Sequence, residues 1–161
     1  MPIKTLKEFL DENKIEYETI THSTAYTAQE IASLTHIKGI ELAKTVIVKI
    51  DGVLAMAVLP ASYQLDLPLL KAAAGAKKVE IATEGEFRSR FPDCETGAMP
   101  PFGPLYGMSV YVDESLTQDK KIAFNAGSHH ELMRLSFDDF QRVVRPKIVA
   151  IAPAVPAAAR L

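Results

Sequence analysis

Residues 45–59 read TVIVKIDGVLAMAVL, two apolar β-type runs on either side of Asp51-Gly52. An Asp-Gly pair tolerates the positive φ angles of a type I′ turn, so this stretch predicts a β-hairpin. The second run, residues 53–59, is apolar at every position and therefore on both of its faces. A strand of that kind is covered on each side, so we expect it to be central in a sheet.

Helical and extended patterns alternate on both sides of the hairpin. Before it, the pattern predicts a helix within residues 5–13, a strand over 15–21 and a helix over 27–39. After it, we expect helices over residues 65–74, 83–90 and 137–144, and strands over 79–82, 108–112, 122–124 and 132–135. This mixture predicts a mixed α/β (α+β) fold.

Length and composition predict one ordinary globular domain over residues 1–161. The formal net charge of -2 argues against a protein that grips nucleic acid by a strongly basic surface, but it is compatible with a small RNA contact. Cys94 is the only cysteine, which excludes a disulfide framework and a cysteine-rich zinc site. We expect a cytoplasmic protein, because no apolar run resembles a signal peptide or approaches the ~20 residues that cross a bilayer.

No standard catalytic signature is present: the chain has no Gly-x-Ser-x-Gly, no phosphate-binding glycine loop and no His-Glu-x-x-His. Lys44 is the first candidate for a functional side chain. On a strand of period two it shares a face with Val46 and Val48, so it can hold an anion at the mouth of an apolar pocket. The alternative is a lysine at the end of a strand that extends into water.

The second candidate is the loop Gly97-Ala98-Met99-Pro100-Pro101-Phe102-Gly103. Its prolines stiffen the chain and its glycines permit close approach, so the loop can present fixed amide N–H groups to a carbonyl or an oxyanion. A rigid connector without a catalytic role is the alternative.

The third candidate is the turn Asn125-Ala126-Gly127-Ser128-His129-His130, which we expect at the start of a strand. Adjacent strand residues face opposite ways, so at most one of His129 and His130 enters a given pocket. The pair is therefore a poor metal site, and either histidine can be exposed or satisfied in the core. Cys94 lies between Asp93 and Glu95, which favour a passive thiol over a nucleophile.

Taken in this order, the segments resemble the YbaK/ProX family, which comprises the free-standing Cys-tRNA(Pro) and Ala-tRNA(Pro) deacylases and the editing domain inserted in bacterial prolyl-tRNA synthetases. The resemblance runs over roughly residues 15–144. The family's characteristic lysine falls on Lys44, and its Gly-x-x-x-Pro loop falls on Gly97 to Pro101, followed by Phe102-Gly103. It implies a mixed fold with a curved, partly closed β-sheet or barrel flanked by helices.

The resemblance also implies a reaction, the hydrolysis of the ester between an amino acid and the 3′-terminal adenosine of a tRNA, without a cofactor, a metal or a protein nucleophile. In that reaction Lys44 and Gly97 are the catalytic residues: Lys44 holds the terminal phosphate or ribose region, and amides of the Gly97 loop polarise the ester carbonyl. A ribose hydroxyl of the substrate helps to activate the water. The resemblance also implies that the substrate is bound by residues 98–103 and by Gly127, Ser128, His129 and His130.

The expected partner is the acceptor end of an aminoacyl-tRNA, with tRNA(Pro) as the expected tRNA, prolyl-tRNA synthetase as a second partner and no membrane contact. The Gly-Ala-Met-Pro-Pro-Phe loop departs from the cysteine-specific type, which favours alanine and leaves cysteine, serine and threonine open. Two other classes remain at this point: a non-catalytic adaptor for a synthetase or RNA, and, least favoured, a metal-dependent hydrolase that uses His129 or His130.

Overall fold

The hairpin predicted from residues 45–59 is present, and it forms the middle of the sheet. Strand β2 (Leu42–Ile50) pairs antiparallel with β3 (Val53–Pro60), and Ile50 lies opposite Val53 next to the turn. Asp51 and Gly52 have φ angles of 49° and 83°. Both are positive, as a type I′ turn requires, so the prediction of the turn is confirmed.

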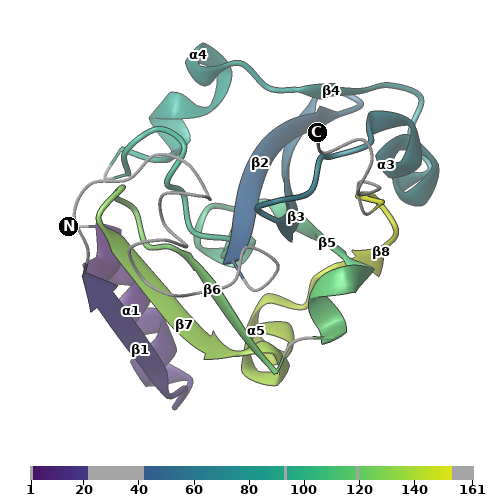
Figure 1. Ribbon diagram of the computed structural model, residues 1–161. Helices are drawn as coiled ribbons and strands as arrows, with labels where there is room; N and C mark the ends of the chain where they lie inside the picture. The colour runs from purple at the N-terminus through teal and green to yellow at the C-terminus, as the bar shows by residue number, and fades with distance from the viewer. Residues whose placement is uncertain (1, 22–41, 93, 119, 154–161) are drawn as a thin grey trace.

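The structure is a computed structural model that describes residues 2–21, 42–92, 94–118 and 120–153 (Figure 1). Its other helices are α1 (Pro2–Glu12), α3 (Leu67–Ala74), α4 (Glu84–Phe87) and α5 (Phe137–Val144). Its other strands are β1 (Tyr17–Thr21), β4 (Val79–Ile81), β5 (Ser109–Asp113), β6 (Lys121–Asn125), β7 (Glu131–Ser136) and β8 (Lys147–Val149). The helix expected over residues 27–39 lies outside the described residues.

The eight described strands form one mixed sheet in the order β1-β7-β6-β2-β3-β5-β8, with β4 paired to β2 off this path. The pairs β2–β6, β3–β5 and β5–β8 are parallel, and the others are antiparallel. Figure 1 shows the strands changing direction from β1 and β7 to β2 and β3, so the sheet is curved. The expected mixed sheet flanked by helices is confirmed, and within the described part β1 and β8 end it without closing it into a barrel.

Strand β2 has two different partners along one of its edges. Strand β3 covers the other edge over residues 43–50. On the first edge, β6 pairs with Leu42 and Ala43, whereas β4 pairs with residues 48–50. The segment between them, residues 44–47, pairs with neither strand, although Ile47 accepts a hydrogen bond from the Ala82 N–H at 3.0 Å. The sheet therefore leaves part of β2 open beside the ends of β6 and β4.

The two faces of β2 contribute to different apolar clusters. Ala43 and Ile47 belong to the main core, which also contains Phe102, Phe124 and Phe140. Leu42 belongs to a small cluster with Ala123 and Leu132, and Val48 to a third cluster that contains Leu70 of α3. Helices α1 and α5 cover the main-core face, and α3 covers the opposite one. Position 44 follows Leu42 by two residues, so it lies on the face opposite the main core.

Local signals account for most element boundaries. Helix α3 begins two residues later than predicted because Asp66 caps it, accepting a hydrogen bond from the Leu69 N–H at 2.9 Å. The helix expected over residues 83–90 is only α4 followed by a 3₁₀ turn over Arg88–Arg90. Strand β8 is absent from the prediction.

As for membranes, no described helix combines the length and apolarity that would let it cross a bilayer.

Candidate active site

Lys44 lies on the part of β2 that neither β4 nor β6 covers. Its backbone pairs with Leu59 of β3, and its side chain is half-buried. Burial lowers the pKa of the Lys44 amine, because taking an ammonium group out of water disfavours its charged form. Among the described residues no carboxylate or hydrogen-bond acceptor contacts this amine. Its N–H donors are therefore available to a ligand.

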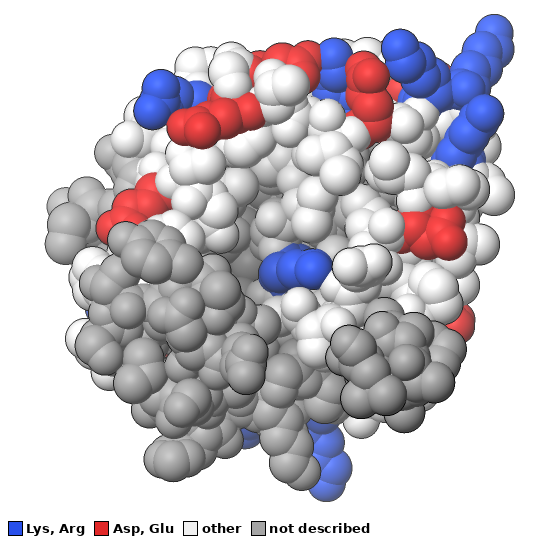
Figure 2. All heavy atoms as spheres, turned by 45° about the horizontal axis from the view of Figure 1, so that its top comes forward, with Lys and Arg blue, Asp and Glu red and all other residues white. Residues whose placement is uncertain are grey.

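Lys49, on the same strand, is paired. Its ammonium group lies 3.1 Å from Glu80 Oε1 and also contacts Glu86 Oε2. The hydrogen bonds that Lys49 donates to Glu86 and Glu80 raise the pKa of Lys49, and the contact with Lys49 lowers the pKa of Glu86 to about 2. Figure 2 shows acidic and basic side chains side by side along the edge formed by β4 and α4, whereas the middle of that face is mostly uncharged.

The loop that begins at Gly97 and the turn that precedes β7 are joined by their backbones. The Gly127 N–H donates to the Ala98 carbonyl at 2.9 Å, and the Glu95 N–H donates to the Gly127 carbonyl at 2.8 Å. Gly127 lies two residues beyond the end of β6, and β6 is the parallel neighbour of β2 at Ala43. The second and third segments singled out in the sequence are thus held together at the end of β6.

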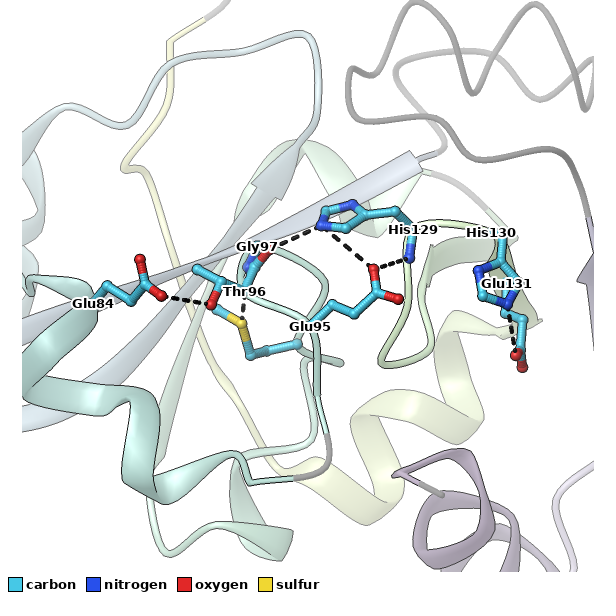
Figure 3. Close-up of polar contacts among 8 residues, drawn as sticks. Glu84, Glu95, Thr96, Gly97, His129, His130 and Glu131 are labelled. Atoms are coloured by element: carbon cyan, nitrogen blue, oxygen red, sulfur yellow. Dashed lines mark hydrogen bonds and ion pairs between the residues drawn. The ribbon is translucent and has the colours of Figure 1, made fainter.

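His129 strengthens this junction with its side chain (Figure 3). Its Nε2 lies 2.8 Å from the Thr96 carbonyl oxygen, and its backbone N–H donates to Glu95 Oε2 at 3.0 Å. Because a carbonyl only accepts, Nε2 carries the proton in this contact. The ring also faces Gly97: a Cβ built on Gly97 would lie 3.5 Å from His129 Cε1. His129 therefore packs against the loop that the sequence analysis singled out.

His130 lies differently. Its side chain is 44% exposed against 12% for His129, and its Nε2 lies 3.5 Å from Glu131 Oε1 (Figure 3). Both histidines belong to the turn that directly precedes β7, which begins at Glu131, so the expected turn at the start of a strand is confirmed. Of the two, His129 is the one that contacts the Gly97 loop.

The Gly97 loop offers fewer free amide donors than its length suggests. Pro100 and Pro101 have no N–H, and the Ala98 N–H already donates to the Glu95 carbonyl at 3.0 Å. The Gly97 N–H faces only the Sδ atom of Met99, at 3.3 Å. A thioether is a weak acceptor, so a carbonyl oxygen from a ligand can replace it. The Gly97 amide, on an exposed residue with φ of 87°, is thus the donor best placed for a ligand.

The rest of this loop, residues 98–103, is buried. Met99 and Phe102 belong to the main core, where the Phe102 ring packs on Phe124 and Phe140. Gly103 has no room for a side chain, since a Cβ there would lie 2.2 Å from the Met108 carbonyl oxygen. These buried side chains anchor the loop to the main core. Their direct contact with a substrate stays a prediction.

Two buried oxygen atoms lie at the end of β6 and in the turn after it: Asn125 Oδ1 and Ser128 Oγ. Neither receives a hydrogen bond in the described part of the chain. Buried polar groups are nearly always hydrogen-bonded, so such atoms often mark a place for a ligand or a moving partner. Asn125 was predicted only as part of the turn over residues 125–130. Its signal was an amide at the end of an otherwise apolar run, residues 122–124.

Other chemistry is less well supported by the described residues. Their His, Cys, Asp and Glu side chains form no group of three that could hold a metal ion. Cys94 Sγ lies 3.7 Å from Tyr106 Oη, in a cavity of about 220 Å³ that also contains Phe91 and Leu105. That cavity belongs to a different set of residues from Lys44, Gly97 and His129.

Comparison with known proteins adds to this geometry. The sequence model of the aminoacyl-tRNA editing domain matches residues 22–143. Among solved structures, a hypothetical protein named APE2540 is 20% identical, with a TM-score of 0.82 over 92% of this chain and 99% of its own. A candidate trans-editing enzyme for prolyl tRNA synthetase is 18% identical, with a TM-score of 0.80 over 95% of this chain and 98% of its own. At these identities, the structural likeness shows a shared fold.

Proposed function

The chain belongs to the aminoacyl-tRNA editing domain family, and from this premise we propose that it hydrolyses the ester of a small amino acid wrongly attached to a tRNA. Family membership supports an aminoacyl-tRNA deacylase. The observation that carries the proposal for this site is Lys44, a half-buried ammonium group with no carboxylate beside it among the described residues. Such a group is suited to hold an anionic or ester-bearing ligand.

In the proposed reaction, water adds to the acyl carbon and the ribose oxygen leaves with a proton. Lys44 holds the phosphate or ribose region of the terminal adenosine. The Gly97 N–H replaces its contact with Met99 Sδ by a hydrogen bond to the ester carbonyl, where negative charge develops. A neighbouring ribose hydroxyl of the substrate assists the water, so the protein needs no nucleophile of its own and no metal.

His129 has a supporting part in this proposal. Its hydrogen bond to the Thr96 carbonyl and its contact with Gly97 hold the loop at the end of β6. A donor that is fixed before the substrate arrives stabilises the developing charge without a cost of reorganisation. Ser128 and the buried residues 98–103 shape the same region, and His130 contributes at its edge.

The proposed substrate is alanine on tRNA(Pro), with cysteine, serine and threonine as the other amino acids to test. An apolar pocket separates side chains that differ by one methylene by only about 1–3 kcal/mol, so neighbouring substrates are expected to be cleaved more slowly rather than excluded. The chain carries a formal net charge of -2, which suits an enzyme that touches mainly the acceptor end. We propose prolyl-tRNA synthetase as the partner that supplies the remaining contacts.

The experiment is deacylation of tRNA(Pro) charged in turn with alanine, cysteine, serine, threonine and proline. We expect the purified chain to cleave the alanine ester fastest and the proline ester slowest, with rates unchanged by EDTA. Lys44→Ala is expected to abolish most of the activity. Cleavage of none of these esters, together with a stable complex with tRNA or prolyl-tRNA synthetase, would instead establish a binding adaptor.

A further inference from the structure

The parallel pairing of β2 and β6 brings Lys44 next to Asn125. The pairs in this register are Leu42 with Ala123 and Ala43 with Phe124, and the next residues along the two strands are Lys44 and Asn125. Neighbouring strands lie about 4.8 Å apart, so the two side chains start at adjacent positions. The sequence places them 81 positions apart, and the sheet brings them together.

The same two residues lie on one face of the sheet. Leu42 and Ala123, each two positions earlier on its strand, share a small apolar cluster with Leu132. Leu132 of β7 pairs directly with Asn125. Ala43 and Phe124 lie in the main core on the opposite side. Because side chains on a strand alternate, both Lys44 and Asn125 point to the side of the small cluster.

Their hydrogen-bonding needs are complementary. In the described part of the chain, Asn125 Oδ1 is a buried acceptor without a donor, and the Lys44 ammonium group is a donor without an acceptor. No hydrogen bond joins the two groups in the structure, and the four-carbon lysine stem is flexible enough to adopt other rotamers. We propose that Asn125 is the positioning residue of Lys44, whose side-chain carbonyl accepts a hydrogen bond from the ammonium group and aims it at the substrate.

The consequence for catalysis rests on the proposed function. A lysine on a flexible stem must be held in one rotamer if it is to meet the same substrate atom at each turnover. Asn125 would provide that constraint without neutralising the charge, whereas an aspartate or glutamate would occupy the ammonium group as Glu80 and Glu86 occupy Lys49. A neutral acceptor thus keeps Lys44 both oriented and available.

The test is an NMR titration of the Lys44 amine in the wild type, Asn125→Ala and Asn125→Asp. Losing an acceptor of the ammonium group lowers the pKa of Lys44 in Asn125→Ala, whereas a carboxylate raises it in Asn125→Asp. Lys49 is the internal control, and Asn13→Ala, which removes a remote amide bonded to Phe9, is the control variant. An unchanged Lys44 titration in Asn125→Ala overturns the proposal, even if Asn125→Asp raises the pKa through proximity of charge.

A second measurement separates positioning from folding. Asn125→Ala removes no side-chain hydrogen bond of the Oδ1 atom in the structure, so its melting temperature is expected to match that of the wild type. Its kcat/KM for the preferred aminoacyl-tRNA is expected to fall about tenfold. If the wild type cleaves no aminoacyl-tRNA, the proposed function fails, and the titration still decides whether Asn125 holds Lys44.

Discussion

Lys44 and Lys49 stand five positions apart on strand β2, yet they occupy opposite electrostatic settings. Burial lowers the pKa of Lys44, which meets no carboxylate among the described residues. Hydrogen bonds to Glu86 and Glu80 raise the pKa of Lys49. The two ends of one strand thus hold a lysine that is available to a ligand and a lysine that is already used by the fold.

The difference follows from what covers the edge of β2 at each end. Strand β4 and helix α4 bring Glu80 and Glu86 to Lys49. Between β4 and β6 none of the described strands covers the edge, and Lys44 lies there beside the end of β6. Ion pairs of this kind near the surface contribute little to stability, so those of Lys49 are not expected to dominate the folding energy. At the Lys44 end of β2, which we call the uncovered end, a ligand can accept the hydrogen bonds of the ammonium group.

The largest effect is expected from removing each lysine in turn. Lys44→Ala should lower kcat/KM for deacylation by about 100-fold or more, because a charge-assisted contact to the substrate is lost. Lys49→Ala should stay within about threefold of the wild type, since its charge is satisfied away from the site. The measurement is steady-state deacylation of alanine-charged tRNA(Pro). Equal losses of kcat/KM in the two variants would contradict the proposal that Lys44, and not Lys49, contacts the substrate.

A smaller effect is expected from the two histidines beside the uncovered end. His129→Ala removes the contact with the Thr96 carbonyl and frees the Gly97 loop, so kcat/KM should fall about tenfold. His130→Ala should have less than about a threefold effect, because the His130 side chain is 44% exposed and its ion pair among the described residues is with its neighbour Glu131. The same deacylation assay compares them, and a greater loss in His130→Ala would contradict the assignment.

The order of the two lysine titrations is the third prediction. Competitive labelling with a trace acylating reagent across pH gives the pKa of each amine from the pH dependence of its own labelling. Lys44 should lose its proton below pH 10.5 and Lys49 above it, in accord with desolvation at one end and carboxylates at the other. A higher pKa for Lys44 than for Lys49 would show that the Lys44 amine is not desolvated in the folded chain.

The smallest effect is expected from Glu86→Gln. Glu86 has its pKa lowered from 4.5 to about 2 in the folded chain, so its stabilising contribution is present above pH 4.5 and is lost as the pH falls toward 2. The melting temperature of Glu86→Gln should therefore lie slightly below that of the wild type at pH 7 and meet it near pH 2. Deacylation should remain at the wild-type rate, since Glu86 serves the Lys49 end.

Local signals explain why much of the fold could be predicted. The Asp51-Gly52 turn, the Asp66 cap of α3 and the Ser136 cap of α5 each depend on residues within a few positions. Strand β8 was missed because its three residues, KIV, pair only with the distant strand β5. The turn that contains both histidines was predicted and is present, but which of the two contacts the Gly97 loop depends on the fold.

The sequence by itself determined the hairpin, most of the described helices and strands, and the three segments that contain Lys44, Gly97 and His129. Only the tertiary structure decided that Lys49 is paired while Lys44 meets no partner among the described residues, that His129 contacts the Gly97 loop, and that Asn125 lies beside Lys44. The reason is physical: turns and caps are set by neighbours in the chain, whereas the charge state and the partners of a side chain depend on groups that the sheet brings from far away. Strand β4 brings Glu80 to Lys49, and helix α4, which follows β4 in the chain, brings Glu86. The pairing of β6 with β2 places Asn125 next to Lys44.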